Sequence, residues 1–149
     1  MTCLTTRWSA LALAACLACA HSSASRRSAE TAPDALVIGR FEDDYGNQFT
    51  ITPTLWLQEP GSRYHIVKWR AESGYLIARN DRANPGDGGL WTRIDWLPLP
   101  GMPPYAWGFC LSAYRAPTAA AAESTRTARR DTPRTGCNGH PFSRMKPVL

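Results

Sequence analysis

The chain has 149 residues and a formal net charge of +5, a length that fits one domain and excludes two large ones. Residues 36–110 carry seven basic and eight acidic side chains, whereas residues 111–149 carry seven basic and two acidic ones. The basic excess is therefore a property of the C-terminal tail, where a solvated charged loop is the simplest interpretation.

An apolar stretch near the N-terminus predicts export. Residues 8–20 contain no charged side chain, follow a segment whose only charge is Arg7, and precede the polar stretch "HSSASRRSAE". This layout is typical of a secretory signal peptide, and the stretch is shorter than the roughly 20 apolar residues of a spanning helix. We expect residues 1–15 to be a signal peptide and, because an exported protein rarely meets nucleic acid, no nucleic-acid partner.

The same stretch contains a candidate lipidation site. The residues "LAAC" at 13–16 resemble the bacterial lipobox, in which the chain is cut before a cysteine whose thiol carries the lipid. The motif predicts Cys16 as the lipidated residue and a membrane contact through the lipid anchor. Leu17 in the next position resembles lipoproteins sorted to an outer membrane. Two alternatives stay open: Cys19 as the modified thiol, and ordinary cleavage at "ACA", which would give a secreted or periplasmic protein.

The rest of the chain divides into a tether and one β-domain. Residues 16–35 are small and polar without periodicity, as in a flexible tether, and residues 36–149 form the predicted domain. Six or seven short stretches of β-type pattern alternate with turn-forming ones such as "DDYGN" and "NDRANPGDGG". This spacing predicts a mostly β fold, a single small antiparallel barrel or sandwich. Residues 117–130 contain the one candidate short helix.

Two cysteines of the domain are candidates for a disulfide. Cys110 lies on a predicted strand, and Cys137 follows after 26 intervening residues. Oxidising compartments outside the cytosol permit the bond, which by chain entropy would stabilise the domain by roughly 3 to 4 kcal/mol. With Cys110 facing away from the main core, the bond would hold the C-terminal tail across the outer face of the sheet.

Several motifs occur in a familiar order: "GRFEDDYG", "YLIARND", "GLWTRIDW" and "GCNGHPF". Together they resemble a family of small exported tryptophan-rich proteins of myxobacteria and related bacteria. The resemblance covers residues 39–142 and implies export, the domain limits and the pairing of the two cysteines, but no reaction. The chain departs from the pattern at "FS" (142–143), where tryptophan is expected, and at "QF" (48–49), where histidine is expected. The second departure disfavours catalysis at that position.

The aromatic residues give the best indication of function. In "LWTRIDWL", the period-2 pattern places Ile94 and Trp96 on one face of the predicted strand. Trp91, Arg93 and Asp95 lie on the other face. Large rings usually fill the core of a small β-domain, as we expect for Trp96 and Trp107. An exposed Trp91 could instead stack on a sugar or contact a partner protein. The candidate binding residues are those of this face and the adjoining loop: Trp91, Arg93, Asn80, Asp81 and Asn84.

We therefore expect a cell-envelope lipoprotein that is a non-catalytic binding or structural module, with a glycan or an envelope protein as partner. Two alternatives stay open: a glycan-directed hydrolase using Asp44 and Asp95, and a lipocalin-like carrier of a small apolar ligand. The Asn- and Asp-rich loop does not match the spacing of a helix-loop-helix calcium site, and a disulfide would remove the thiol of any Cys137–His140 pair. We expect no metal site and no cofactor.

Overall fold

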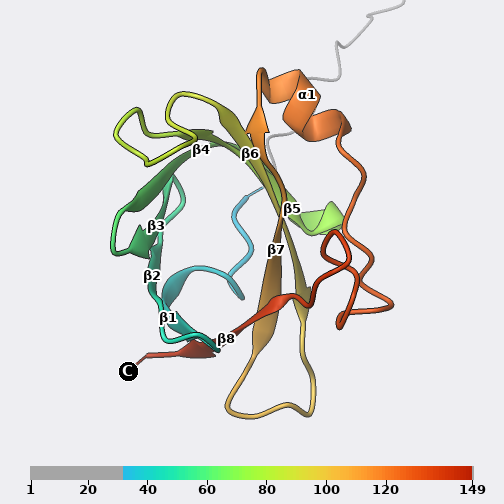
Figure 1. The fold of residues 1–149 in the computed structure, drawn as a ribbon. Coiled ribbons are helices and arrows are strands. Elements are labelled where there is room, and N and C mark those ends of the chain that lie inside the picture. The colour runs from blue at the N-terminus through green and yellow to red at the C-terminus, as the bar shows by residue number, and fades with distance from the viewer. Residues whose placement is uncertain (1–31, 149) are drawn as a thin grey trace, which may run out of the picture.

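The computed structural model describes residues 32–148, which form a closed antiparallel barrel of eight strands, one short helix and one 3-10 turn at Ala71–Ser73 (Figure 1). Each strand pairs with the next along the chain, and the last strand pairs with the first. The predicted signal peptide and the candidate lipidation site Cys16 lie outside the described residues. The elements are β1 (Gly39–Asp43), β2 (Gln48–Ile51), β3 (Leu55–Glu59), β4 (Ser62–Arg70), β5 (Tyr75–Asn80), β6 (Trp91–Pro98), β7 (Trp107–Ala116), α1 (Ala119–Ser124) and β8 (Ser143–Pro147).

The predicted antiparallel β-domain is confirmed in its barrel form, with one strand more than expected. The additional strand is β8, which pairs with β1 and β7 and so closes the barrel. Its sequence, "SRMKP", has a single buried apolar side chain, Met145, between two charged ones. A period-2 pattern needs apolar residues at several alternate positions, and a single one does not indicate a strand.

The centre of the barrel is filled by side chains, many of them aromatic. Phe41 and Trp107 meet edge to face with ring centroids 5.0 Å apart, and Trp56 meets Trp107 in the same way at 6.0 Å. Such aromatic pairs contribute about 0.5 to 1.5 kcal/mol each beyond their buried area. Trp96 and Trp107 are buried, as predicted. The buried residues of this core are Val37, Phe41, Phe49, Ile51, Trp56, Tyr64, Ile66, Trp69, Leu76, Ala78, Ile94, Trp96, Trp107, Phe109 and Met145.

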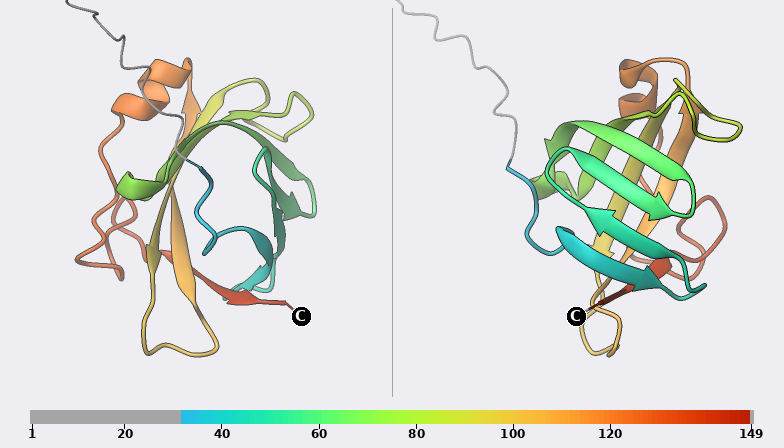
Figure 2. Two further views of the ribbon diagram at one scale, coloured as in Figure 1. Left: turned by 180° about the vertical axis from the view of Figure 1, so that it is seen from behind. Right: turned by 90° about the vertical axis from the view of Figure 1, so that its left-hand side faces the viewer.

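A long C-terminal segment, residues 117–142, covers part of the outside of the barrel, and we call it the arm (Figure 2). It begins with α1, the predicted short helix, in which the Thr118 hydroxyl accepts a hydrogen bond from the Ala121 N–H and so caps the first turn. The helix contacts β5, β6 and β7, and its residue Ala122 is fully buried. No helix in the described part of the chain is long and apolar enough to span a membrane.

The predicted disulfide joins the arm to the barrel. Cys110 of β7 is bonded to Cys137 of the arm, with their Cα atoms 5.4 Å apart. Cys110 faces outward, as expected, and belongs to a second apolar cluster, between the sheet and the arm, that also contains Leu97, Leu99, Ala128 and Phe142. The arm is thus held by a covalent bond and by its own small core.

Candidate functional site

The structure places three of the five predicted binding residues in the interior. The exposed fractions of Asn80, Asn84 and Arg93 are 1%, 6% and 3%. The Asn80 amide donates to the carbonyls of Asp87 and Tyr114 and accepts from the Thr92 hydroxyl, which uses both ends of the side chain inside the fold. These three residues have no surface to offer a ligand, so the sequence-based assignment of them as a contact surface is wrong.

Asn84 attaches the loop between β5 and β6 to β4. Its carboxamide accepts from the Arg63 N–H at 2.8 Å and donates to the Arg63 carbonyl at 2.8 Å, in the manner of one more pair of sheet hydrogen bonds. In the same loop, Asp81 accepts from the Ala83 N–H and lies 2.8 Å from the His65 ring. These hydrogen bonds, the one from Ala83 first, lower the pKa of the Asp81 carboxyl. The polar residues of this loop therefore brace its own conformation.

Replacing Asn84 by alanine is expected to destabilise the protein by about 1 to 3 kcal/mol, because the Arg63 N–H loses its partner and the Arg63 carbonyl keeps only the hydrogen bond from the Asp81 N–H. Urea denaturation measures this change in the free energy of unfolding. The control is Arg82→Ala, an exposed change in the same loop that is expected to cost less than about 0.5 kcal/mol. Equal losses in the two variants would show that the loop is not held by Asn84.

Trp91 and Arg93 differ in exposure although they share the outer face of β6. Trp91 is half-buried, and the Arg79 guanidinium lies 5.8 Å from the centre of its ring. Arg93 is covered because the arm crosses this face, and its Nη1 donates to the carbonyls of Glu123 and Thr125. The alternation in "WTRID" predicts the face correctly, but it carries no information on what covers it.

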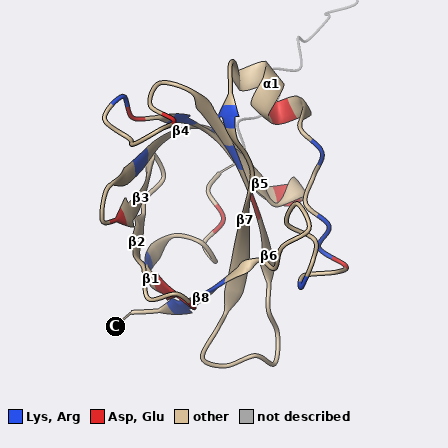
Figure 3. Ribbon diagram, viewed as in Figure 1, with Lys and Arg blue, Asp and Glu red and all other residues tan. Residues whose placement is uncertain are grey.

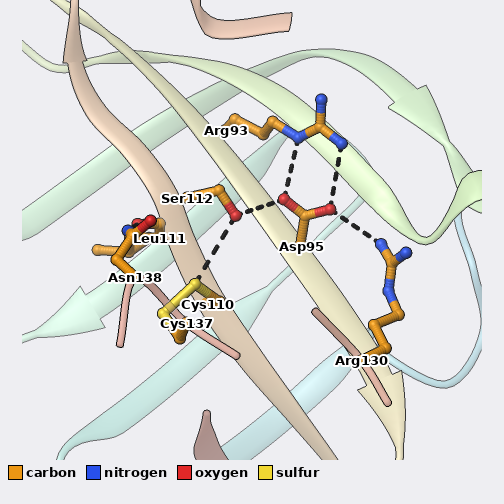
Figure 4. Close-up of a disulfide and its surroundings, with 8 residues drawn as sticks. All are labelled: Arg93, Asp95, Cys110, Leu111, Ser112, Arg130, Cys137 and Asn138. Carbon is orange, nitrogen blue, oxygen red and sulfur yellow. Dashed lines mark hydrogen bonds and ion pairs between the residues drawn. A yellow bond between two sulfur atoms is a disulfide. The ribbon is translucent and has the colours of Figure 1, made fainter. Parts of the chain in front are cut away.

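Asp95 lies at the centre of a buried ion cluster (Figure 4). Its carboxylate has no exposed surface and accepts hydrogen bonds from Arg93 Nε at 2.9 Å, from Arg130 of the arm at 2.9 Å and from the Ser112 hydroxyl. The ion pair between Arg93 and Asp95 joins two residues of one strand and is buried. A carboxylate in this state has no access to a substrate.

Two further residues considered for catalysis are also engaged. Asp44 pairs with Arg144 at 2.9 Å. The Cys137 thiol is oxidised in the disulfide, and the backbones of Cys137 and His140 form an isolated bridge. Among residues 32–148, no group of three or more His, Cys, Asp or Glu side chains is placed to hold a metal ion.

A pocket of about 540 Å³, which we call the mouth pocket, opens at one end of the barrel. It arises because β7 has ten residues but pairs with β8 only at residues 107–109, which leaves the rest of that strand edge open. The Asn138 side chain caps part of this edge by donating to the Leu111 carbonyl. Phe109 and Leu111 supply apolar surface in the pocket, the β1–β2 turn borders it on one side, and the end of the arm borders it on the other.

The lining of the mouth pocket combines exposed aromatic rings with free polar groups. Tyr45 is 71% exposed and Tyr114 is 49% exposed, although both contribute to the lining. The Gln58 amide and the His140 ring also line it, and within the described residues neither makes a side-chain hydrogen bond. The one carboxylate of the lining, Asp43, is tied to the N–H groups of the β1–β2 turn. Apart from this engaged carboxylate, the pocket offers aromatic rings, amides and an imidazole.

Sequence reasoning missed these residues for identifiable reasons. Tyr45 stands in "DDYGN", where turn formation fully explains the pattern, and Asn138 stands beside a cysteine that has a structural role. The two residues are brought to one pocket only by the closure of the barrel through β8. One feature of the sequence does indicate the site: a tyrosine within a polar turn is far from the core, so its ring is expected to be exposed.

The fold and the site together define a class: a small, closed and side-chain-filled β-barrel with a polar and aromatic pocket at one end. In comparisons with known proteins, no family model, no curated protein and no solved structure matches this chain. The resemblance to exported tryptophan-rich proteins therefore stays a prediction, and the function is inferred from the fold and the pockets.

Proposed function

We propose that this protein is a non-catalytic module of the cell envelope that binds a carbohydrate in the mouth pocket. The observation that carries the proposal is the combination, on a rigid barrel, of two exposed tyrosines with side-chain amides and an imidazole. A sugar ring has an apolar C–H face that stacks on an aromatic ring and hydroxyls that both donate and accept hydrogen bonds. Amide and imidazole groups also do both, so they match hydroxyls better than charged groups do.

Binding is favoured over turnover by the state of the carboxylates. Glycoside hydrolysis generally needs two carboxyl groups about 5 to 9 Å apart on either side of the scissile bond. Of the two candidates considered, Asp95 is sealed by two arginines and Asp44 is paired with Arg144. The only carboxylate that lines the mouth pocket is Asp43, which is held by its own turn.

The mouth is favoured over the barrel interior as the binding site. A carrier of apolar ligands keeps an interior space, and ligand pockets generally measure about 300 to 1,000 Å³. The centre of this barrel is instead occupied by rings in mutual edge-to-face contact, including Phe49, Trp56 and Phe109. An interior ligand would have to displace this core.

Export and lipid anchoring form part of the proposal. The disulfide supports an oxidising compartment, and the motif at Cys16 supports attachment to a membrane, by preference an outer one. A protein held there would meet envelope glycans at high local concentration, which makes a weak binding pocket useful. Mass spectrometry of the mature N-terminus decides between Cys16, Cys19 and an unmodified secreted form.

Glycan binding is tested with the variants Tyr45→Ala and Tyr114→Ala. We expect the wild-type protein to bind members of an array of neutral and acidic oligosaccharides, and each variant to lose at least about tenfold in affinity for the best of them by calorimetry. Because both rings are exposed to solvent, each substitution should change the free energy of unfolding by less than about 0.5 kcal/mol.

The matched control is Val67→Ala, which removes an exposed apolar side chain of β4 outside the pocket and should leave binding unchanged. Absence of binding to every glycan of the array, or equal losses in Val67→Ala and the tyrosine variants, would refute the proposed function.

A further inference from the structure

A second pocket, of about 440 Å³, lies on the arm beside the mouth pocket, and we call it the arm pocket. Asn138 is common to the linings of both pockets. The arm pocket is lined by Arg126 and Arg129, by Thr127 and Thr135, and by backbone at Gly136 and Gly139. Its chemistry differs from that of the mouth, because it presents cationic and hydroxyl groups without an aromatic ring or a carboxylate.

The two arginines of the arm pocket are not neutralised within residues 32–148. Both are exposed, and neither side chain forms an ion pair or a hydrogen bond with another described residue. Some basic residues elsewhere on the barrel are paired, as Lys68 is with Glu123 and Lys146 with Glu42, whereas Arg40 and Arg82 are exposed without an ion pair. Figure 3 shows several basic segments along the arm below α1, with an acidic segment among them. A concave site with unpaired positive charge attracts anions.

The segment that carries these arginines is held in place from below. Arg93 donates to the Thr127 hydroxyl, and Arg130 donates to the backbone carbonyls of Trp96 and Gly74. On the other side of the pocket, the Arg129 N–H donates to the Gly136 carbonyl at 2.9 Å.

The backbone contact at Gly136 is so close that a Cβ there would lie 1.9 Å from the Arg129 carbonyl oxygen. Only glycine fits at that position. Together with the disulfide of the adjoining Cys137, these contacts fix the backbone that presents the two arginines before any ligand arrives, which reduces the entropy lost on binding.

We propose that the ligand is an acidic saccharide. Its sugar ring occupies the mouth pocket, and a carboxylate, phosphate or sulfate group on the same molecule is bound by Arg126 and Arg129 in the arm pocket. A guanidinium recognises each of these anions through paired N–H donors, and the threonine hydroxyls can donate further hydrogen bonds. This inference rests on the proposed function and adds the charge class of the ligand.

The test compares matched neutral and acidic glycans. Oligosaccharides of one backbone are measured with and without a carboxylate, phosphate or sulfate group, using wild-type protein and the double variant Arg126→Gln/Arg129→Gln. We expect the wild type to bind the acidic form at least about tenfold more tightly at low salt. The double variant should bind both forms with the affinity that the wild type has for the neutral one. Added salt should reduce the preference of the wild type, because the arginines are exposed.

The matched control is Arg40→Gln/Arg82→Gln, which removes two exposed arginines outside both pockets and gives the same net charge. It should keep the preference for acidic glycans. If glycans bind but the wild type shows no such preference, or the Arg126/Arg129 variant keeps it, the inference is wrong while the proposed function stands. The tyrosine variants test glycan binding as such, and the arginine variant tests the preference for acidic glycans. Failure of the further inference can therefore be distinguished from failure of the proposed function.

Vesicles of phosphatidylcholine with and without phosphatidylglycerol provide the competing source of anions. If the two arginines are needed for binding to anionic vesicles but make no difference to acidic glycans, they belong to a lipid-binding surface and the inference is overturned. Acidic-glycan preference that depends on both arginines, with vesicle binding unchanged in the double variant, supports it.

Discussion

Replacing Asp95 by alanine is expected to destabilise the protein by about 3 to 5 kcal/mol, because it leaves the buried Arg93 without its counter-charge and also removes the carboxylate partner of the partly exposed Arg130. Arg93 has 4% of its side chain exposed and Asp95 has none, so water replaces little of the lost interaction. The loss would be a large part of the roughly 5 to 15 kcal/mol that stabilises a typical domain. Urea denaturation gives the free energy of unfolding, and a lower midpoint with an unchanged slope would show that the variant lost stability.

The matched control for this prediction is Asp44→Ala, which breaks an ion pair of similar length at the surface. Arg144 in that pair has 42% of its side chain exposed, so the loss is expected to be at most about 1 kcal/mol. If Asp95→Ala cost no more than Asp44→Ala, the cluster would contribute little to stability. Asp95→Asn, which keeps the shape of the side chain and removes its charge, separates the electrostatic part from packing.

The buried cluster also shows why the sequence predicted the barrel better than its outer face. Alternation along β6 identifies which residues point outward, and the disulfide was predictable because two cysteines of an exported domain have few other uses. What lies over an outward residue depends on the path of a distant segment. Arg130, which completes the Asp95 cluster, is 35 positions away in a stretch of arginine, threonine and alanine that has no apolar period.

The arm attaches to the barrel in a way that periodicity cannot reveal. Its apolar anchors are isolated residues, Ala122, Ala128 and Phe142, and besides the disulfide and the side-chain ion pairs its attachment includes hydrogen bonds from arginines to backbone carbonyls. Any residue can supply a backbone carbonyl, so these contacts leave no mark on the sequence of the arm. Composition therefore indicates only a solvated basic tail, whereas Arg130 of that tail is partly buried and pairs with the buried Asp95.

The candidate site was missed for a related reason. A pocket at the mouth of a barrel combines turn residues from different hairpins, and each of these residues is explained locally by turn formation. The unpaired edge of β7 that creates the space depends on the short length of β8, the one strand that the sequence pattern did not indicate. A binding module can be proposed from the sequence without knowing how β8 ends. The residues of its pocket can be assigned only once the open edge of β7 is known.

Removing the disulfide with Cys110→Ser and Cys137→Ser is expected to lower the free energy of unfolding by roughly 3 to 4 kcal/mol. The bond spans 27 positions, and without it the unfolded chain gains the entropy of an open loop of that size. The arm keeps its ion contacts, so we expect the native state to loosen locally rather than to collapse. Hydrogen exchange should become faster at the N–H groups of Arg129 and Phe142, which donate to the carbonyls of Gly136 and Pro133 within the arm, while β1 to β4 stay protected.

A double-mutant cycle with Asp95→Ala tests whether the bond and the ion cluster hold the same unit. Both act on the arm, because Cys137 and Arg130 belong to it and Ser112, next but one to Cys110 in β7, donates to Asp95. Once the disulfide is absent and the arm opens, Arg130 leaves Asp95 more readily and the aspartate substitution should cost less. We expect a coupling of about 0.5 to 3 kcal/mol. Strictly additive losses would mean that the two attachments stabilise separate parts of the molecule, and acidic-glycan binding should then survive the loss of either one.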